Sequence, residues 1–172
     1  MNGLALRPTR EQFEHAHRLM GIASLDSVRL IHVRAADMTA DGCPVKNAEE
    51  KPMPTATATL IPNTNCFRVV FGHVVHAKRE TTGGGTEIQV DASFELRYSY
   101  PPDTQPVPTS DELQAFANTN ALMNCWPYWR ELVQSTVTRM NLPPITVPLL
   151  RYVPPPPETK PEESAKEQKT KI

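Results

Sequence analysis

The sequence predicts an α+β fold, with a four-stranded antiparallel sheet, a long C-terminal helix packed on one face and an extra short N-terminal helix. Residues 87–98 alternate strictly between apolar and polar side chains, which indicates a strand with one buried and one solvated face. Three other β-type segments precede it, and residues 122–140 carry apolar side chains at spacings of three and four. Strands in succession followed by a helix are typical of one sheet covered by a helix on one face.

The first predicted element is the short N-terminal helix. Thr9 and Gln12 form a capping-box pattern at its start, and Gly21 is expected to stop it. Phe13 and Met20 belong to a narrow apolar stripe, so this helix must dock on another part of the protein.

The sheet is expected from four segments in a row. They are residues 27–38, 55–61, 66–80 and 87–100. In the first segment the alternation is imperfect, and Ile31, Val33 and Ala35 are expected on one side. A long loop separates the first two strands, and a glycine-rich turn joins the last two as a hairpin.

The long helix is expected to begin at Thr109, which forms a second capping-box pattern with Glu112. The polar residues 118–120 are expected to interrupt it. Pro127 then lies either in the first turn of a restarted helix or at a kink in a continuous one, and Pro143 is expected to close the helix.

Composition indicates a single domain of cytoplasmic type. The chain has 172 residues, of which 39% are hydrophobic, and its formal net charge is -1. This charge gives no reason to expect nucleic acid as a partner, and no apolar run suits membrane insertion or a signal peptide. Cys43, Cys66 and Cys125 are expected to be reduced thiols. We expect a helical extension at residues 1–25, the main domain at 26–153 and a disordered Pro/Lys/Glu tail at 154–172.

Residues 127–148 carry the most specific motif. They read "PYWRELVQSTVTRMNLPPITVP", and with the layout of strands and helix they resemble the SecB family of bacterial protein-export chaperones. The matching positions are Pro127, Tyr128, Arg130, Glu131, Arg139, Leu142, Pro143, Val147 and Pro148. The resemblance covers about residues 27–152, and the N-terminal part is closest to the SecB-like branch found beside toxin–antitoxin pairs.

The resemblance implies a homotetramer, a dimer of dimers, that holds unfolded preproteins or an aggregation-prone antitoxin in apolar grooves. It implies no ATP, cofactor, metal or catalytic residue, and the SecA translocation ATPase is a partner in the family. This chain departs from the family in its near-neutral charge and in its N-terminal helix.

Apolar residues of the sheet and the long helix are the candidates for a client-binding groove, with plain core packing as the alternative. The groove candidates are Leu60, Phe71, Phe94, Leu122, Trp126, Tyr128, Trp129, Leu142 and Ile145, and Phe13 and Met20 would extend the groove. Successive helical residues are rotated by ~100°. The aromatic side chains of "WPYWRELV" therefore point in several directions, and part of their surface is expected to meet a second subunit or a client.

The remaining candidates are charged. Glu87, Asp91 and Glu95 share one strand face, which is either a solvated face or an acidic docking face for SecA. Arg130 and Glu131 are expected to form ion pairs at a subunit contact. The histidines of the pairs His15/His17 and His73/His76 do not share a face, so no metal site is predicted.

The sequence therefore predicts a holdase chaperone that is not an enzyme, because no nucleophile–base or metal-ligand spacing appears. The alternative is an oligomeric adaptor of SecB-like fold that binds one folded partner. Affinity for denatured chains distinguishes the two hypotheses.

Overall fold

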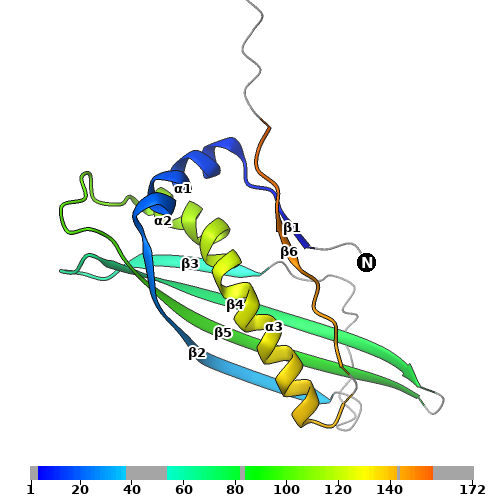
Figure 1. Ribbon diagram of the computed structural model, residues 1–172. Coiled ribbons are helices and arrows are strands. Elements are labelled where there is room, and N and C mark those ends of the chain that lie inside the picture. The colour runs from blue at the N-terminus through cyan, green and yellow to red at the C-terminus, as the bar shows by residue number, and fades with distance from the viewer. Residues whose placement is uncertain (1–3, 38–53, 82–83, 143, 157–172) are drawn as a thin grey trace, which may run out of the picture.

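The computed structural model describes residues 4–37, 54–81, 84–142 and 144–156, and it has the predicted α+β architecture (Figure 1). In chain order the elements are β1 (Leu4–Leu6), α1 (Arg10–Ile22), β2 (Ser24–Asp37), β3 (Thr55–Leu60), β4 (Cys66–Thr81), β5 (Gly84–Ser99), α2 (Ser110–Phe116), η1 (Ala117–Ala121), α3 (Leu122–Arg139) and β6 (Leu150–Tyr152). The expected disordered tail lies largely outside the described residues, as does the long loop before β3.

The four long strands form one antiparallel sheet in the order β2-β5-β4-β3. The strict alternation predicted for β5 is confirmed, since Ile88, Val90, Phe94, Leu96 and Tyr98 are all buried. They face α2, η1 and α3, which run across one side of the sheet in Figure 1. The hydrophobic core lies between this inner face and the helices.

Strand β2 contains a bulge that the sequence pattern hides. Its pairing with β5 shifts between Leu30 and His32, so that Leu30 lies opposite Phe94 and Val33 lies opposite Ala92. Ile31 is the extra residue of the bulge. The predicted imperfect alternation is therefore confirmed, and Val33 and Ala35 share one side, opposite Ala92 and Val90 of β5. Ile31 does not follow in their alternation as expected, because one inserted residue resets the two-residue period.

The C-terminal helix is continuous from α2 to α3. The polar residues expected to interrupt it instead form the π-helical turn η1, in which the Thr119 hydroxyl donates to the Ala115 carbonyl at 2.8 Å. Pro127 lies inside α3. The helix ends before the prolines, where Asn141 adopts a φ of 55°. The Asn141 amide donates to Thr138 and the Leu142 amide donates to Val137, which is a Schellman end.

Helix α1 packs beside α2 and contributes to the same core. The capping box of Thr9 and Gln12 is confirmed, but the helix continues past Gly21 to Ile22 and is capped by Ala23. Both Nε and Nη2 of Arg18 donate to the Glu112 carboxylate at 2.7 Å, which ties α1 to the start of α2.

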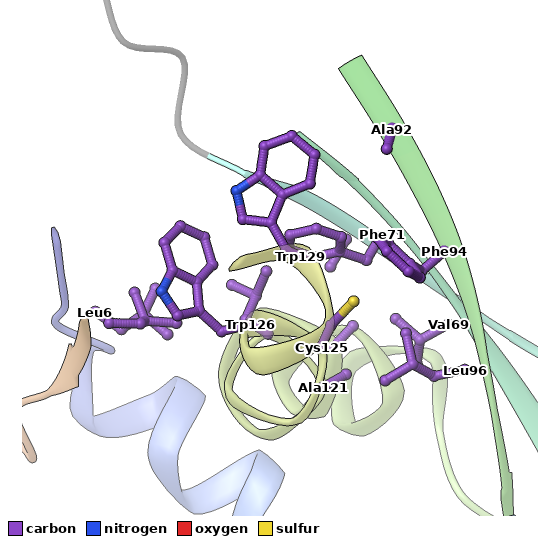
Figure 2. Packing of buried hydrophobic residues seen from close by; sticks show 14 of the residues in the cluster. Leu6, Val69, Phe71, Ala92, Phe94, Leu96, Ala121, Cys125, Trp126 and Trp129 are labelled. Atoms are coloured by element: carbon purple, nitrogen blue, oxygen red, sulfur yellow. The ribbon is translucent and has the colours of Figure 1, made fainter. Parts of the chain in front are cut away.

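Strands β1 and β6 pair in parallel, with Leu4 opposite Leu150 and Leu6 opposite Tyr152. This terminal strand pair was not predicted from the sequence. It brings the two ends of the fold together beside the helices (Figure 1), and Figure 2 shows Leu6 of β1 across α3 from the sheet.

Candidate functional site

Five of the predicted groove residues lie in the core of a single chain. They are Phe71, Phe94, Leu122, Trp126 and Trp129, and each is at most 5% exposed. In this conformation these five side chains pack inside the chain and have almost no exposed area with which to contact another molecule.

Trp126 points away from the sheet toward Leu6 of β1 (Figure 2). Its indole Nε1 donates to the Pro148 carbonyl at 2.9 Å, and Leu6 and Leu150 of the terminal strand pair are buried. The aromatic side chains of "WPYWRELV" therefore point in more than one direction, as predicted. The expectation that part of the aromatic surface of "WPYWRELV" meets a second subunit or a client stays a prediction. The chain covers Trp126 with its own ends and buries Trp129, so Tyr128, which is 46% exposed, is the aromatic side chain of this motif that leaves surface for such a contact.

His73 lies on the inner face of β4 between the two tryptophans. Its ring centroid is 5.5 Å from that of Trp126 and 5.1 Å from that of Trp129. Burial lowers the pKa of His73 to about 4, so the imidazole is neutral near pH 7. Its Nδ1 is buried without a hydrogen-bond partner among the described residues, as is Nε1 of Trp129. The sequence carried a signal for this position, because Phe71, His73 and Val75 alternate along β4 and therefore share one face of the strand.

One flank of α3 carries an exposed apolar surface, which we call the β2 flank and define by Leu30, Val33 and Tyr128. Leu30 is 41% exposed and Val33 is 46% exposed although both lie on the inner face of the sheet. On α3, Asn124 donates to the Tyr98 hydroxyl of β5 at 3.0 Å. Tyr128 follows one turn later on the same flank and is 46% exposed. The helix thus leaves the inner face of the edge strand β2 partly uncovered.

The opposite flank of α3 is held against the C-terminal segment. Arg130 Nε donates to the Val147 carbonyl at 3.1 Å, so part of this predicted subunit-contact residue is engaged within the chain. Leu149 is 64% exposed and Val153 is 39% exposed, and both point away from the core while Leu150 between them is buried. These two positions were not among the predicted groove residues, although the run "PLLRYV" indicates apolar surface.

The other predicted groove residues do not join into one surface. Leu60, Leu142 and Ile145 are half-buried against the core. Phe116 packs edge-on against Phe67, the strand partner of Leu60, whereas Leu142 follows the far end of the helix. A helix rises ~1.5 Å per residue, so Leu60 and Leu142 lie at opposite ends of the molecule.

The candidates for groove extension and subunit contact are at the surface. Phe13 and Met20 of α1 are half-buried, and Met20 packs on the core. Glu131 is exposed on α3 and lines a shallow hollow with Gln134 and Arg139. Their proposed roles stay predictions.

The outer face of the sheet carries paired charges. Arg29 Nη2 lies 2.9 Å from the Glu95 carboxylate, and Arg68 approaches it to 4.0 Å. His32 lies 3.9 Å from Asp91. The Glu87 side chain is outside the described part of the chain. The acidic docking face for SecA stays a prediction, and these basic neighbours offset its charge.

The described residues also bear on metal binding and membrane insertion. No group of three or more His, Cys, Asp or Glu side chains in this part of the chain is arranged to hold a metal ion. No helix that the structure describes is long and apolar enough to cross a membrane.

The sequence matches no protein-family model and no curated protein. Among solved structures, the chain is similar to a SecB-like chaperone from Mycobacterium tuberculosis in complex with a ChAD peptide from the HigA1 antitoxin. The identity is 22% and the TM-score is 0.64, over 83% of this chain and 99% of that chain. A protein of unknown function from Streptococcus agalactiae is 9% identical with a TM-score of 0.38, over 74% of this chain and 97% of that one.

The first of these likenesses agrees with the element order, the antiparallel sheet and the long helix described above. The predicted resemblance is confirmed for the fold, and this chain has a SecB-like fold.

Proposed function

We propose that this protein is an ATP-independent chaperone of the cytoplasm that binds unfolded or partly folded polypeptide and prevents its aggregation, with an aggregation-prone antitoxin as a client. The observation that carries the proposal is the apolar surface that one copy leaves uncovered on both flanks of α3. Contiguous apolar surface on a folded protein usually serves for binding. The SecB-like fold supports the proposal, because a chain of this fold was solved with an antitoxin peptide.

We assign the β2 flank to a second copy of the chain. Among the strands that the structure describes, β2 lies at the edge of the sheet and pairs only with β5, so its outer backbone groups are candidates to pair with a strand of another copy. Leu30 and Val33 are exposed apolar side chains on the inner face of that strand, and Tyr128 of α3 is an exposed aromatic side chain on the flank of the helix that Asn124 joins to β5. Strand pairing and apolar burial together favour a symmetric contact between copies, which is the first step toward the expected dimer of dimers.

We assign the opposite flank to the client. Leu149 and Val153 present apolar side chains there, next to the short terminal strand pair, whose edges pair with no other strand that the structure describes. An extended client segment would add main-chain hydrogen bonds at this edge and bury its apolar side chains against Leu149 and Val153. Such binding tolerates many client sequences, because most of its hydrogen bonds involve the backbone.

Suppression of aggregation of a chemically denatured model protein tests the function. The parent chain is expected to suppress aggregation when present at a comparable subunit concentration. Leu149→Asp should weaken client binding by about tenfold or more, because it removes apolar burial and introduces an unpaired charge. Gln134→Asp, an exposed change on α3, is the matched control. Aggregation that proceeds equally with and without the protein would rule the chaperone out, and binding to one folded partner alone would support the adaptor.

Coexpression with an antitoxin separates the two client classes. A dedicated antitoxin chaperone raises the soluble fraction of the antitoxin, and Leu149→Asp abolishes the gain. If the antitoxin fraction does not change while exported preproteins accumulate in soluble form, the general export role and a SecA partner are favoured.

A further inference from the structure

A basic hollow lies on the outer face of the sheet, on the side opposite α3, and its volume is about 480 Å³. Three strands supply one arginine each, namely Arg29 from β2, Arg97 from β5 and Arg68 from β4. Ile61 and Pro62, from the turn between β3 and β4, form an apolar wall. We call this site the arginine hollow.

The charges of the arginine hollow are unbalanced. Arg68 and Arg97 lie directly opposite each other in the β4–β5 pair, an arrangement of like charges that destabilises a sheet. Glu95 is the single carboxylate in the lining, and it already interacts with Arg29 and Arg68. Arg97 has no ion-pair partner among the described residues. Three guanidinium groups therefore surround one carboxylate, and the excess positive charge is available to an anionic ligand.

We propose that the arginine hollow binds an extended, acidic segment of a partner protein. The hollow crosses all four strands, and neighbouring strands are ~4.8 Å apart, so it spans roughly 14 Å. An extended chain advances ~3.3 Å per residue, so about four or five residues cross it. Carboxylates of such a segment meet the forked guanidinium groups, and an aliphatic side chain packs on Ile61 and Pro62.

The chemistry of the lining favours a peptide over a single small anion. A lone anion contacts only part of a hollow of this length and leaves the apolar wall unused. An acidic peptide with interspersed aliphatic residues satisfies both the arginines and the wall. Because the site lies on the other face of the sheet from both flanks of α3, it does not depend on the chaperone function.

The test uses the fluorescein-labelled hexapeptide Glu-Glu-Leu-Leu-Glu-Glu, in which each face of an extended chain carries two glutamates and one leucine. The glutamine counterpart is the control peptide, and anisotropy is measured with the full chain. We expect Arg97→Gln and Arg68→Gln each to weaken binding of the acidic peptide by about five- to tenfold. Arg34→Gln changes an exposed arginine on the same face, opposite Asp91, and should leave the affinity unchanged. Added salt should weaken binding, because the contacts are exposed to solvent.

Three results would overturn the proposal. The first is equal binding of the acidic and glutamine peptides, and the second is unchanged affinity in both arginine variants. The third is displacement of the peptide by a single-stranded oligonucleotide that binds more tightly, which would assign the hollow to nucleic acid. Arg97→Gln relieves the repulsion with Arg68, so the variant should unfold at or above the temperature of the parent. It should also suppress client aggregation as the parent does, which separates this test from that of the proposed function.

Discussion

At the scale of single residues, His73 is a partly buried polar side chain that packs against the aromatic core. A neutral imidazole is inserted between two tryptophans, and one of its nitrogens is buried without a partner among the described residues. The pKa of His73 is about 4 in the folded chain, against an ordinary value of 6.5. Protonation therefore favours the unfolded state, where water solvates the charge.

His73 makes the stability of the protein depend on pH in a defined window. Its stabilising contribution is fully present above pH 6.5 and is lost as the pH falls toward about 4. We expect the free energy of unfolding, measured by urea denaturation, to fall across this window in the parent. The fall should be shallower in His73→Leu. His17→Leu, at an exposed position, is the control, and an equally steep fall in His73→Leu would contradict the expectation.

The ion pair of Arg18 and Glu112 acts in a lower pH range. Hydrogen bonds from Arg18 are the main reason that the pKa of Glu112 falls from 4.5 to about 2. The stabilisation is present above pH 4.5 and is lost as the pH falls through about 2. Glu112→Gln should lower the free energy of unfolding at neutral pH by about 1–3 kcal/mol.

The control for this change is Glu14→Gln, which removes a 60% exposed carboxylate 3.8 Å from Arg10. Its effect should stay within about 0.5 kcal/mol. Chemical denaturation at neutral and at acid pH measures both variants. A Glu112→Gln protein as stable as the parent at neutral pH would show that the pair does not fasten α1 to α2.

At the scale of elements, the end of α3 is set by one residue with a left-handed backbone. Asn141 has a φ of 55°, a conformation that asparagine and glycine tolerate better than other residues. Asn141→Ala should therefore destabilise the protein by about 1 kcal/mol, whereas Asn141→Gly should be neutral or stabilising. Thermal denaturation of the two variants side by side measures the difference, and equal losses in both would mean that the asparagine side chain, not the backbone, matters there.

The terminal strand pair is the element that most changes the interpretation of α3. Two strands of three residues each add little stability alone. They are held by the hydrogen bond from Trp126 to Pro148 and by the burial of Leu6 and Leu150. These strands cover Trp126. The exposed apolar side chains beside α3 are therefore Tyr128 on one flank and Leu149 on the other, and not the tryptophans.

At the scale of the whole molecule, the β2 flank determines the expected assembly. Val33→Asp places a charge on the exposed inner face of the edge strand and should convert the oligomer to smaller species, because a buried unpaired charge is costly. Light scattering coupled to size exclusion measures the mass. Arg34→Asp, the neighbouring residue on the other face, is the control. A parent chain that is already monomeric at working concentration would contradict the assignment.

Local pattern in the sequence was enough for most of the fold. The alternation in β5 predicted which of its side chains are buried, and the two capping boxes predicted the starts of α1 and α2. These signals are local, since they depend only on the geometry of one strand or one helical turn. The bulge at Ile31 was missed because the pairing of β2 with β5 sets it. The end of α1 was placed one residue too early, since the helix continues to Ile22 and the Ala23 amide donates to the Leu19 carbonyl.

The sequence by itself determined that this chain folds as a sheet covered by a long helix and that "WPYWRELV" presents apolar groups in more than one direction. Only the tertiary structure decided which of those groups are hidden. Burial depends on what lies against a side chain, and the residues covering Trp126 come from both ends of the described chain. In the same way, Arg29, Arg68 and Arg97 lie close together because of the register in which β2, β5 and β4 pair. No single segment of the sequence specifies that register.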